Sequence, residues 1–176
     1  MNKKLFIIPI IALCSVLACT SDKKAIEETA VFKLSSPDFN ADSAFAYTKA
    51  QVDFGPRIPS TDAHANCADY LVKKFKSFGG EVLVQKGAAK TYDRKTHQLK
   101  NIIAAFNPEK AQRVLVSAHW DARPFSDQDP DPKMRDKPFD AANDGASGVA
   151  IMLEMARQIQ QKQPNVGVDF ISSYTT

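Results

Sequence analysis

The chain has little cysteine and no excess of one charge. Of its three cysteines, Cys14 and Cys19 lie in an apolar N-terminal segment, which leaves Cys67 as the one cysteine of the remaining chain. No intramolecular disulfide is then available to that part. The formal net charge of the 176 residues is +3, and removing residues 1–18, which hold two lysines and no acid, lowers it to +1. A nearly neutral body gives no basis for nucleic-acid binding.

The sequence also lacks an apolar run long enough to span a bilayer, which takes about 20 residues. Residues 5–18 are apolar apart from Ser15 and follow two lysines, which predicts a signal peptide over residues 1–18. The run ends in Val16-Leu17-Ala18-Cys19, which resembles a bacterial lipoprotein processing site. We therefore expect a lipid on Cys19, a polar tether over residues 19–35, and an exported protein anchored on the periplasmic or cell-surface side of a membrane. The alternative is an ordinary signal peptide with an unmodified cysteine.

Hydrophobic periodicity predicts alternating helices and strands in the rest of the chain. Ser36 and Pro37 indicate a helix start, with Phe39, Ala46 and Ala50 expected to face inward. The expected helices cover residues 36–54, 60–78 and 147–163, and the expected strands cover residues 81–85, 101–106, 113–119 and 166–171. Strands 101–106 and 113–119 are nearly continuous in apolar residues, which is typical of inner strands covered on both faces. The order of elements predicts a layered α/β domain, with Cys67 buried on a helix.

A long acidic connection joins the strand that ends at His119 to the helix that begins near Ser147. Compact domains rarely keep more than about 15 residues without regular structure unless the loop is functional or disordered. The connection contains seven aspartates: Asp121, Asp127, Asp129, Asp131, Asp136, Asp140 and Asp144. Asp127, Asp129 and Asp131 alternate like the first ligands of a calcium loop, but prolines occupy the positions that need glycine and glutamate. We interpret these three as part of a solvated loop.

Two places in this connection have the residue types of a metal site. His119 and Asp121 follow directly after a strand, where α/β proteins bind their ligands. Asp144 lies where the loop turns into the next helix, beside Gly145. Zinc accepts both imidazole and carboxylate ligands, so one ion could bind between them. The plain alternatives are a surface histidine and an aspartate that only caps the helix.

Four segments together resemble the N-terminal half of bacterial glutaminyl cyclases, relatives of the zinc aminopeptidases: FGPRIPSTDAHANCADYLVKKF, NIIAAF, RVLVSAHWDARP and AANDGASGVAIMLEMARQI. The resemblance implies a three-layer α/β/α domain over residues 36–176, with a mixed central sheet and zinc at the carboxyl ends of its strands. It implies a reaction in which an N-terminal glutamine of a peptide or protein cyclises to pyroglutamate and releases ammonia. Asn143 favours a cyclase, because the aminopeptidases more often have two consecutive aspartates there.

The resemblance also implies roles for particular residues. Asp144 matches a zinc ligand, followed in many relatives by a cis peptide bond, and His119 is a further candidate ligand. Asp121 would orient a ligand or line the substrate entrance with Trp120, for which simple packing is the alternative. A cyclase would hold one zinc ion and an aminopeptidase two.

The sequence departs from this family after the last expected strand. Relatives continue with an acidic pair, which includes the general acid/base, whereas this chain reads Ser172-Ser173-Tyr174-Thr175-Thr176. The catalytic acid/base is therefore expected beyond Thr176. We expect a fold truncated at its C-terminus and a fragment that is inactive by itself. A zinc aminopeptidase of the same fold and a non-catalytic truncated lipoprotein are the alternatives.

Overall fold

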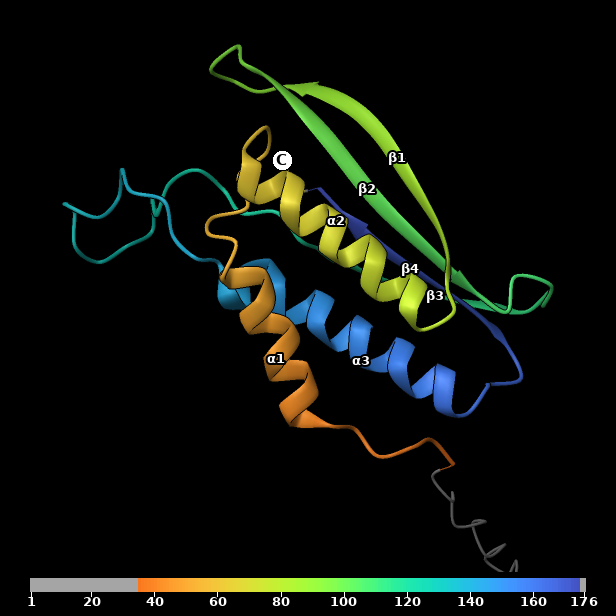
Figure 1. Cartoon of the computed structure of the whole chain (residues 1–176). Helices are drawn as coiled ribbons and strands as arrows, with labels where there is room; N and C mark the ends of the chain where they lie inside the picture. The colour runs from red at the N-terminus through yellow and green to blue at the C-terminus, as the bar shows by residue number, and fades with distance from the viewer. Residues whose placement is uncertain (1–34, 175–176) are drawn as a thin grey trace, which may run out of the picture. The chain divides into compact units, whose positions relative to one another are not determined.

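Three α-helices and a mixed four-stranded sheet make up the part of the chain that the computed structural model describes, residues 35–174 (Figure 1). The predictions for Cys19, the signal peptide and most of the tether lie outside these residues. The elements in chain order are α1 (Ala41–Val52), α2 (Asp62–Ser77), β1 (Glu81–Lys90), β2 (Thr96–Phe106), β3 (Arg113–His119), the short helical turn η1 (Ala142–Ala146), α3 (Ser147–Gln161) and β4 (Gly167–Ser173).

The sheet has the strand order β1-β2-β4-β3. β1 and β2 form an antiparallel hairpin, β2 and β4 are also antiparallel, and β3 runs parallel to β4, with Val116 opposite Phe170. The predicted α/β fold with a mixed sheet is confirmed. Within the described residues β3 is an edge strand, with Leu115 63% exposed. The expectation that residues 113–119 form an inner strand is therefore wrong for this part of the chain.

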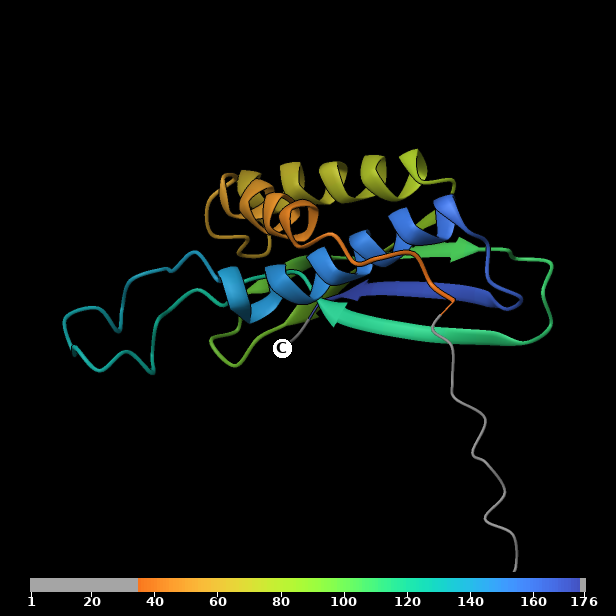
Figure 2. The ribbon, with the colours of Figure 1, turned by 90° about the horizontal axis from the view of Figure 1, so that it is seen from below.

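All three helices cover the same side of the sheet (Figure 2). The residues between 35 and 174 therefore show a helical layer and the sheet, which are two of the three expected layers. Of these helices, none is both long and apolar enough to span a membrane.

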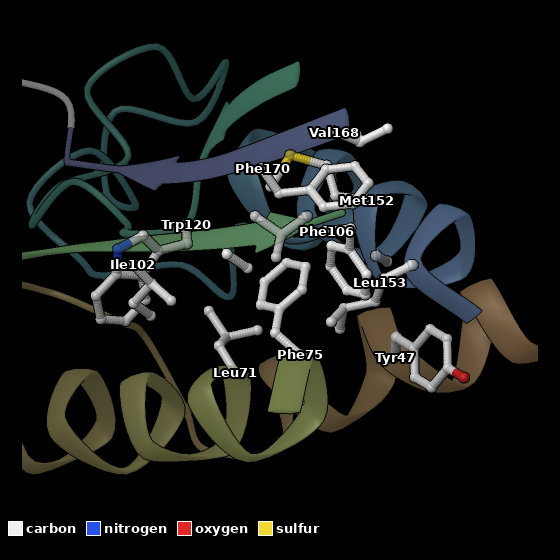
Figure 3. Close-up of a cluster of buried hydrophobic side chains, with 14 of the residues drawn as sticks. Tyr47, Leu71, Phe75, Ile102, Phe106, Trp120, Met152, Leu153, Val168 and Phe170 are labelled. Atoms are coloured by element: carbon white, nitrogen blue, oxygen red, sulfur yellow. The ribbon is translucent and has the colours of Figure 1, made fainter. Parts of the chain in front are cut away.

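The core lies between the helices and the sheet (Figure 3). Leu71 and Phe75 project from α2 toward the sheet, where the ring of Phe75 lies 5.7 Å from that of Phe170 on β4. α3 contributes the apolar face predicted from its periodicity, because Val149, Leu153, Ala156 and Ile159 are all buried. Cys67 is fully buried on α2, as predicted.

The first helix differs from its prediction. It begins at Ala41, and the side chain of Asn40 caps it by accepting the Ser43 N–H at 2.8 Å. Asn40 offers a carbonyl oxygen to the unpaired first turn, so the helix begins there rather than at Ser36. Its buried residues are Tyr47 and Gln51, whereas Phe39 is 52% exposed and Ala46 is exposed.

The hairpin strands are longer than predicted. β1 and β2 pair over ten residues, from Glu81 opposite Ala105 to Lys90 opposite Thr96. The outer part of the hairpin is mostly exposed. Backbone pairing continues there without a buried face, so the sequence shows no apolar alternation by which the strands could be recognised.

Candidate active site

The end of β3 and the start of α3 lie against each other at one edge of the sheet. We call residues 119–123 the strand lip and residues 140–147 the helix lip. His119 Nε2 lies 3.1 Å from Asp144 Oδ1, and His119 Nδ1 lies 3.5 Å from Asp121 Oδ1. The structure thus brings together the three residues that the sequence singled out. Asp121 is 3% exposed, whereas the Asp144 side chain is half exposed.

Gly145 makes the close approach of the two lips possible. Its φ is 140°, which favours glycine, and an added Cβ would lie 2.7 Å from the His119 carbonyl oxygen and 2.8 Å from its ring. The backbone of Asp144 has φ −93° and ψ 73°, outside the helical region, so the helical turn η1 is kinked at this residue. The residues described contain no cis peptide bond, so the expectation of a cis bond after Asp144 is wrong for this structure.

Arg123 is a site residue that sequence reasoning missed. Its guanidinium lies 2.9 Å from Asp127 and 3.8 Å from Asp144 Oδ2. Asp144 therefore has a cationic group on one side and an imidazole on the other. The sequence offered a signal for this residue, because Arg123 belongs to RVLVSAHWDARP, one of the segments that carry the resemblance.

The structure places Trp120 in the core, which agrees with the packing alternative, and not in the lining of the cavity beside Asp121. The side chain is fully buried, and its indole N–H donates to the Lys100 carbonyl at 3.1 Å. Its ring stacks on His64 of α2 at 4.2 Å between centroids. Burial, with a smaller contribution from Lys100, lowers the pKa of His64 to about 4, so the imidazole under the tryptophan is neutral near pH 7. Trp120 is thus a packing residue beneath the site.

A second missed residue, Arg57, lies underneath both lips. It is fully buried and donates to the carbonyl oxygens of Trp120 at 3.1 Å and of Ala141 at 2.8 Å. Arg57 lies between two expected helices, in one of the segments that carry the resemblance, but its residue type alone did not indicate this role.

A cavity of about 550 Å³ opens beside Asp121, a size typical of sites for small ligands. Asp121 and Arg123 line it together with Ile58, Tyr92, Phe125 and Tyr174. Burial raises the pKa of Tyr174, and the negative charge of Asp121 raises it further. A second cavity of about 400 Å³, beside the end of α3, has no carboxylate in its lining. Of these two cavities, the one of about 550 Å³ is lined by residues of the strand lip, among them Asp121 and Arg123, whereas His119 and Asp144 are not part of its lining.

The described residues do not complete a zinc site. Between residues 35 and 174 no group of three or more histidine, cysteine, aspartate or glutamate side chains is placed to hold a metal ion. His119 and Asp144 are two donors in direct contact with each other, whereas a catalytic zinc takes three protein ligands and keeps one open position. This part of the chain offers at most a portion of the ligand set.

Comparison with known proteins gives a consistent result. Residues 101–174 match the model of Peptidase family M28. The glutaminyl cyclase of Tannerella forsythia is 49% identical with a TM-score of 0.76, over 80% of this chain and 50% of that chain. A Zn-dependent exopeptidase from Parabacteroides distasonis is 51% identical with a TM-score of 0.77, over 81% of this chain and 50% of that one. An aminopeptidase of Bacillus subtilis is 33% identical over 65% of this chain and 24% of its own length.

The chain spans about half the length of these two solved structures. The matched region contains β3, both lips and α3, so the similarity includes the residues of the candidate site. The resemblance stated from the motifs is confirmed: over residues 101–174 the chain is similar to Peptidase family M28, and it has the fold of bacterial glutaminyl cyclases and zinc-dependent exopeptidases.

Proposed function

We propose that this chain provides one wall of the active site of a zinc-dependent glutaminyl-peptide cyclotransferase, which acts on the N-termini of peptides or proteins. The observation that carries the proposal is the pair of His119 and Asp144, 3.1 Å apart. His119 also lies 3.5 Å from Asp121, which lines a cavity of about 550 Å³. Asn143 in the helix lip favours the cyclase over a zinc aminopeptidase, which is the second candidate. A solved glutaminyl cyclase and a solved Zn-dependent exopeptidase are similar to this chain to nearly the same degree.

The residues present have definite roles in this proposal. Asp144, with His119, would supply part of the ligand set of one zinc ion in a cyclase or of two in an aminopeptidase. Asp121 is nearly buried at the cavity wall, where its negative charge would attract the α-amine of a peptide. Arg123 would fix the orientation of the Asp144 carboxylate through its contact at 3.8 Å. Because the described residues offer two donors, we propose that the 176-residue chain is inactive by itself.

A chimeric enzyme tests the proposal. Residues 35–171 would replace the matching half of the Tannerella forsythia cyclase, and the chimera would be given a peptide with N-terminal glutamine. We expect ammonia release and a blocked N-terminus, both abolished by Asp144→Ala. Release of free glutamine would favour the aminopeptidase instead. A chimera that folds but does neither would contradict both functions, and the 176-residue chain measured alongside tests its own inactivity.

We also propose that the protein is exported and held at a membrane through a lipid on Cys19. The support is the resemblance of residues 16–19 to a lipoprotein processing site. Cys19→Ser should move the protein from the membrane fraction to the soluble fraction, and Cys14→Ser is the matched control because it should leave the distribution unchanged. Equal distribution of the Cys19→Ser and unmodified proteins would contradict the anchor.

A further inference from the structure

Arg57 connects three segments that are far apart in the sequence. Its side chain is fully buried, and its guanidinium donates to backbone carbonyl oxygens. These acceptors are Trp120 at 3.1 Å, Asp140 at 2.9 Å, Ala141 at 2.8 Å, Gln51 at 3.4 Å and Gly55 at 3.5 Å. Its own carbonyl oxygen accepts the Ala122 N–H at 3.1 Å. One residue is therefore bonded to the strand lip, to the helix lip and to the end of α1.

The helix lip needs such support. Ala141 has φ 51° and ψ 43°, a left-handed conformation that is unfavourable for a residue with a Cβ. The guanidinium donates hydrogen bonds to the carbonyl oxygens of Ala141 and of the preceding residue, Asp140. The kinked turn at Asp144 comes three residues later in the sequence. The hydrogen bonds therefore act at the point where the backbone of the helix lip is strained.

A buried guanidinium is costly unless its donors are satisfied. Burial lowers the pKa of Arg57, and the nearby acids Asp140 and Asp121 counteract that effect. An apolar side chain of similar volume would fill the same space without this cost. Only arginine offers five N–H donors in a planar fork, which is the geometry that several carbonyl groups from different segments require.

We propose that Arg57 is a positioning residue, which holds the strand lip and the helix lip at the separation that lets His119 and Asp144 face each other. The guanidinium holds both lips through their backbone carbonyl oxygens, and these hydrogen bonds do not use the side chains of His119 and Asp144. The inference rests on the proposed function only in taking His119 and Asp144 as candidate metal ligands of the site. The mechanical role can be measured without substrate or metal.

Amide hydrogen exchange of the purified chain, followed by mass spectrometry, tests this role in Arg57→Ala and Arg57→Lys. The lips contain suitable probes, because the amides of Trp120, Ala122 and Ala146 all donate to backbone carbonyls. We expect exchange in residues 119–123 and 140–147 to become about tenfold faster or more in the alanine variant, because charged hydrogen bonds contribute about 1.5–3 kcal/mol each. Exchange in α3 beyond residue 150 should change much less.

Arg113→Ala is the matched control. Arg113 also donates to backbone carbonyls, those of Asn107 and Phe106, but it lies at the opposite end of β3 and pairs with Asp169. Its loss should leave exchange in both lips unchanged. Guanidinium ion at a non-denaturing concentration should restore protection of the lips in Arg57→Ala and have no effect on Arg113→Ala.

Two results in the alanine variant would overturn the proposal. The first is unchanged exchange in both lips of Arg57→Ala. The second is uniform acceleration throughout the domain without rescue by guanidinium, which would mean that Arg57 is only a part of the core. If the alanine variant does not fold, Arg57→Lys decides, because a lysine amine cannot reach the carbonyls of both lips at once. Slow exchange in both lips of that variant would likewise refute the role.

Discussion

The buried imidazole of His64 should make the stability of the domain depend on pH. It is 3% exposed and stacks on Trp120, and its Nε2 atom has no hydrogen-bond partner among the described residues. Burial lowers its pKa from 6.5 to about 4. The unfolded chain therefore binds the proton more tightly, so acid favours unfolding. The full contribution is present above pH 6.5 and is lost as the pH falls from 6.5 toward 4.

This loss can be estimated from the shift of the pKa. Linkage gives a decrease of about 2 kcal/mol in the free energy of unfolding between about pH 7 and about pH 5, within a limit of about 3 kcal/mol for the whole shift. Carboxyl groups with ordinary pKa values contribute little above about pH 5. The window from pH 7 to pH 5 therefore isolates the histidine from most of the acid titration of the domain.

Urea unfolding followed by fluorescence measures the effect, because Trp120 is the one tryptophan of the chain and lies on His64. The variant His64→Phe keeps a ring under Trp120 but cannot bind a proton. Its free energy of unfolding should change by less than about 0.5 kcal/mol over the same window. His97→Gln is the control and should retain the pH dependence. Identical pH dependence in His64→Phe and the unmodified chain would refute the argument.

Three other residues give further tests. Gly145→Ala should lower the free energy of unfolding by about 2 kcal/mol or more, because the φ of Gly145 is 140° and an added Cβ would lie 2.7 Å from the His119 carbonyl oxygen. Urea unfolding measures this change. Gly87→Ala is the control and should have little effect, because there is open space around Gly87. Cys67 should stay unlabelled by thiol reagents in the native protein, because burial raises its pKa to about 12; peptide mapping that finds rapid native labelling would contradict this. The hydrogen bond with Arg157 lowers the pKa of Glu154, so the stability that the ionised carboxylate contributes is lost as the pH falls through this lowered pKa. Glu154→Gln should therefore remove part of the loss of stability in strong acid. Thermal unfolding at a series of pH values measures the difference.

The parts of the fold that the sequence predicted well are those that bury an apolar face. α2 begins after Thr61, whose side chain accepts the His64 N–H, and α3 buries the four residues that its periodicity indicated. The meeting of His119 and Asp144 could also be expected, because ligands bind at the carboxyl ends of strands in α/β sheets. In each case the type of the side chain, whether apolar, capping or metal-binding, indicates where the residue lies.

Arg57 could not be assigned from the sequence for a physical reason. Its partners are backbone carbonyl groups up to 84 residues away, and every residue has a carbonyl group. No residue type marks the acceptors, so the segment FGPRIPS gives no sign of this role, although it belongs to one of the segments that carry the resemblance. The same reasoning applies to the outer hairpin, where exposed backbone pairing between β1 and β2 leaves no pattern in the side chains.

The period of two along a strand explains how three adjacent residues, His119, Trp120 and Asp121, come to have such different surroundings. Successive side chains of a strand point to opposite faces, and Trp120 continues the ladder by donating its backbone N–H to the Ser173 carbonyl at 3.2 Å. It therefore has the same parity as Val116 and Ala118, which pack against the core, and it is buried against His64. His119 and Asp121 share the opposite parity, and their side chains come within 3.5 Å of each other. The buried tryptophan thus anchors the strand lip from the core side, so that the imidazole and the carboxylate on either side of it are held at the site.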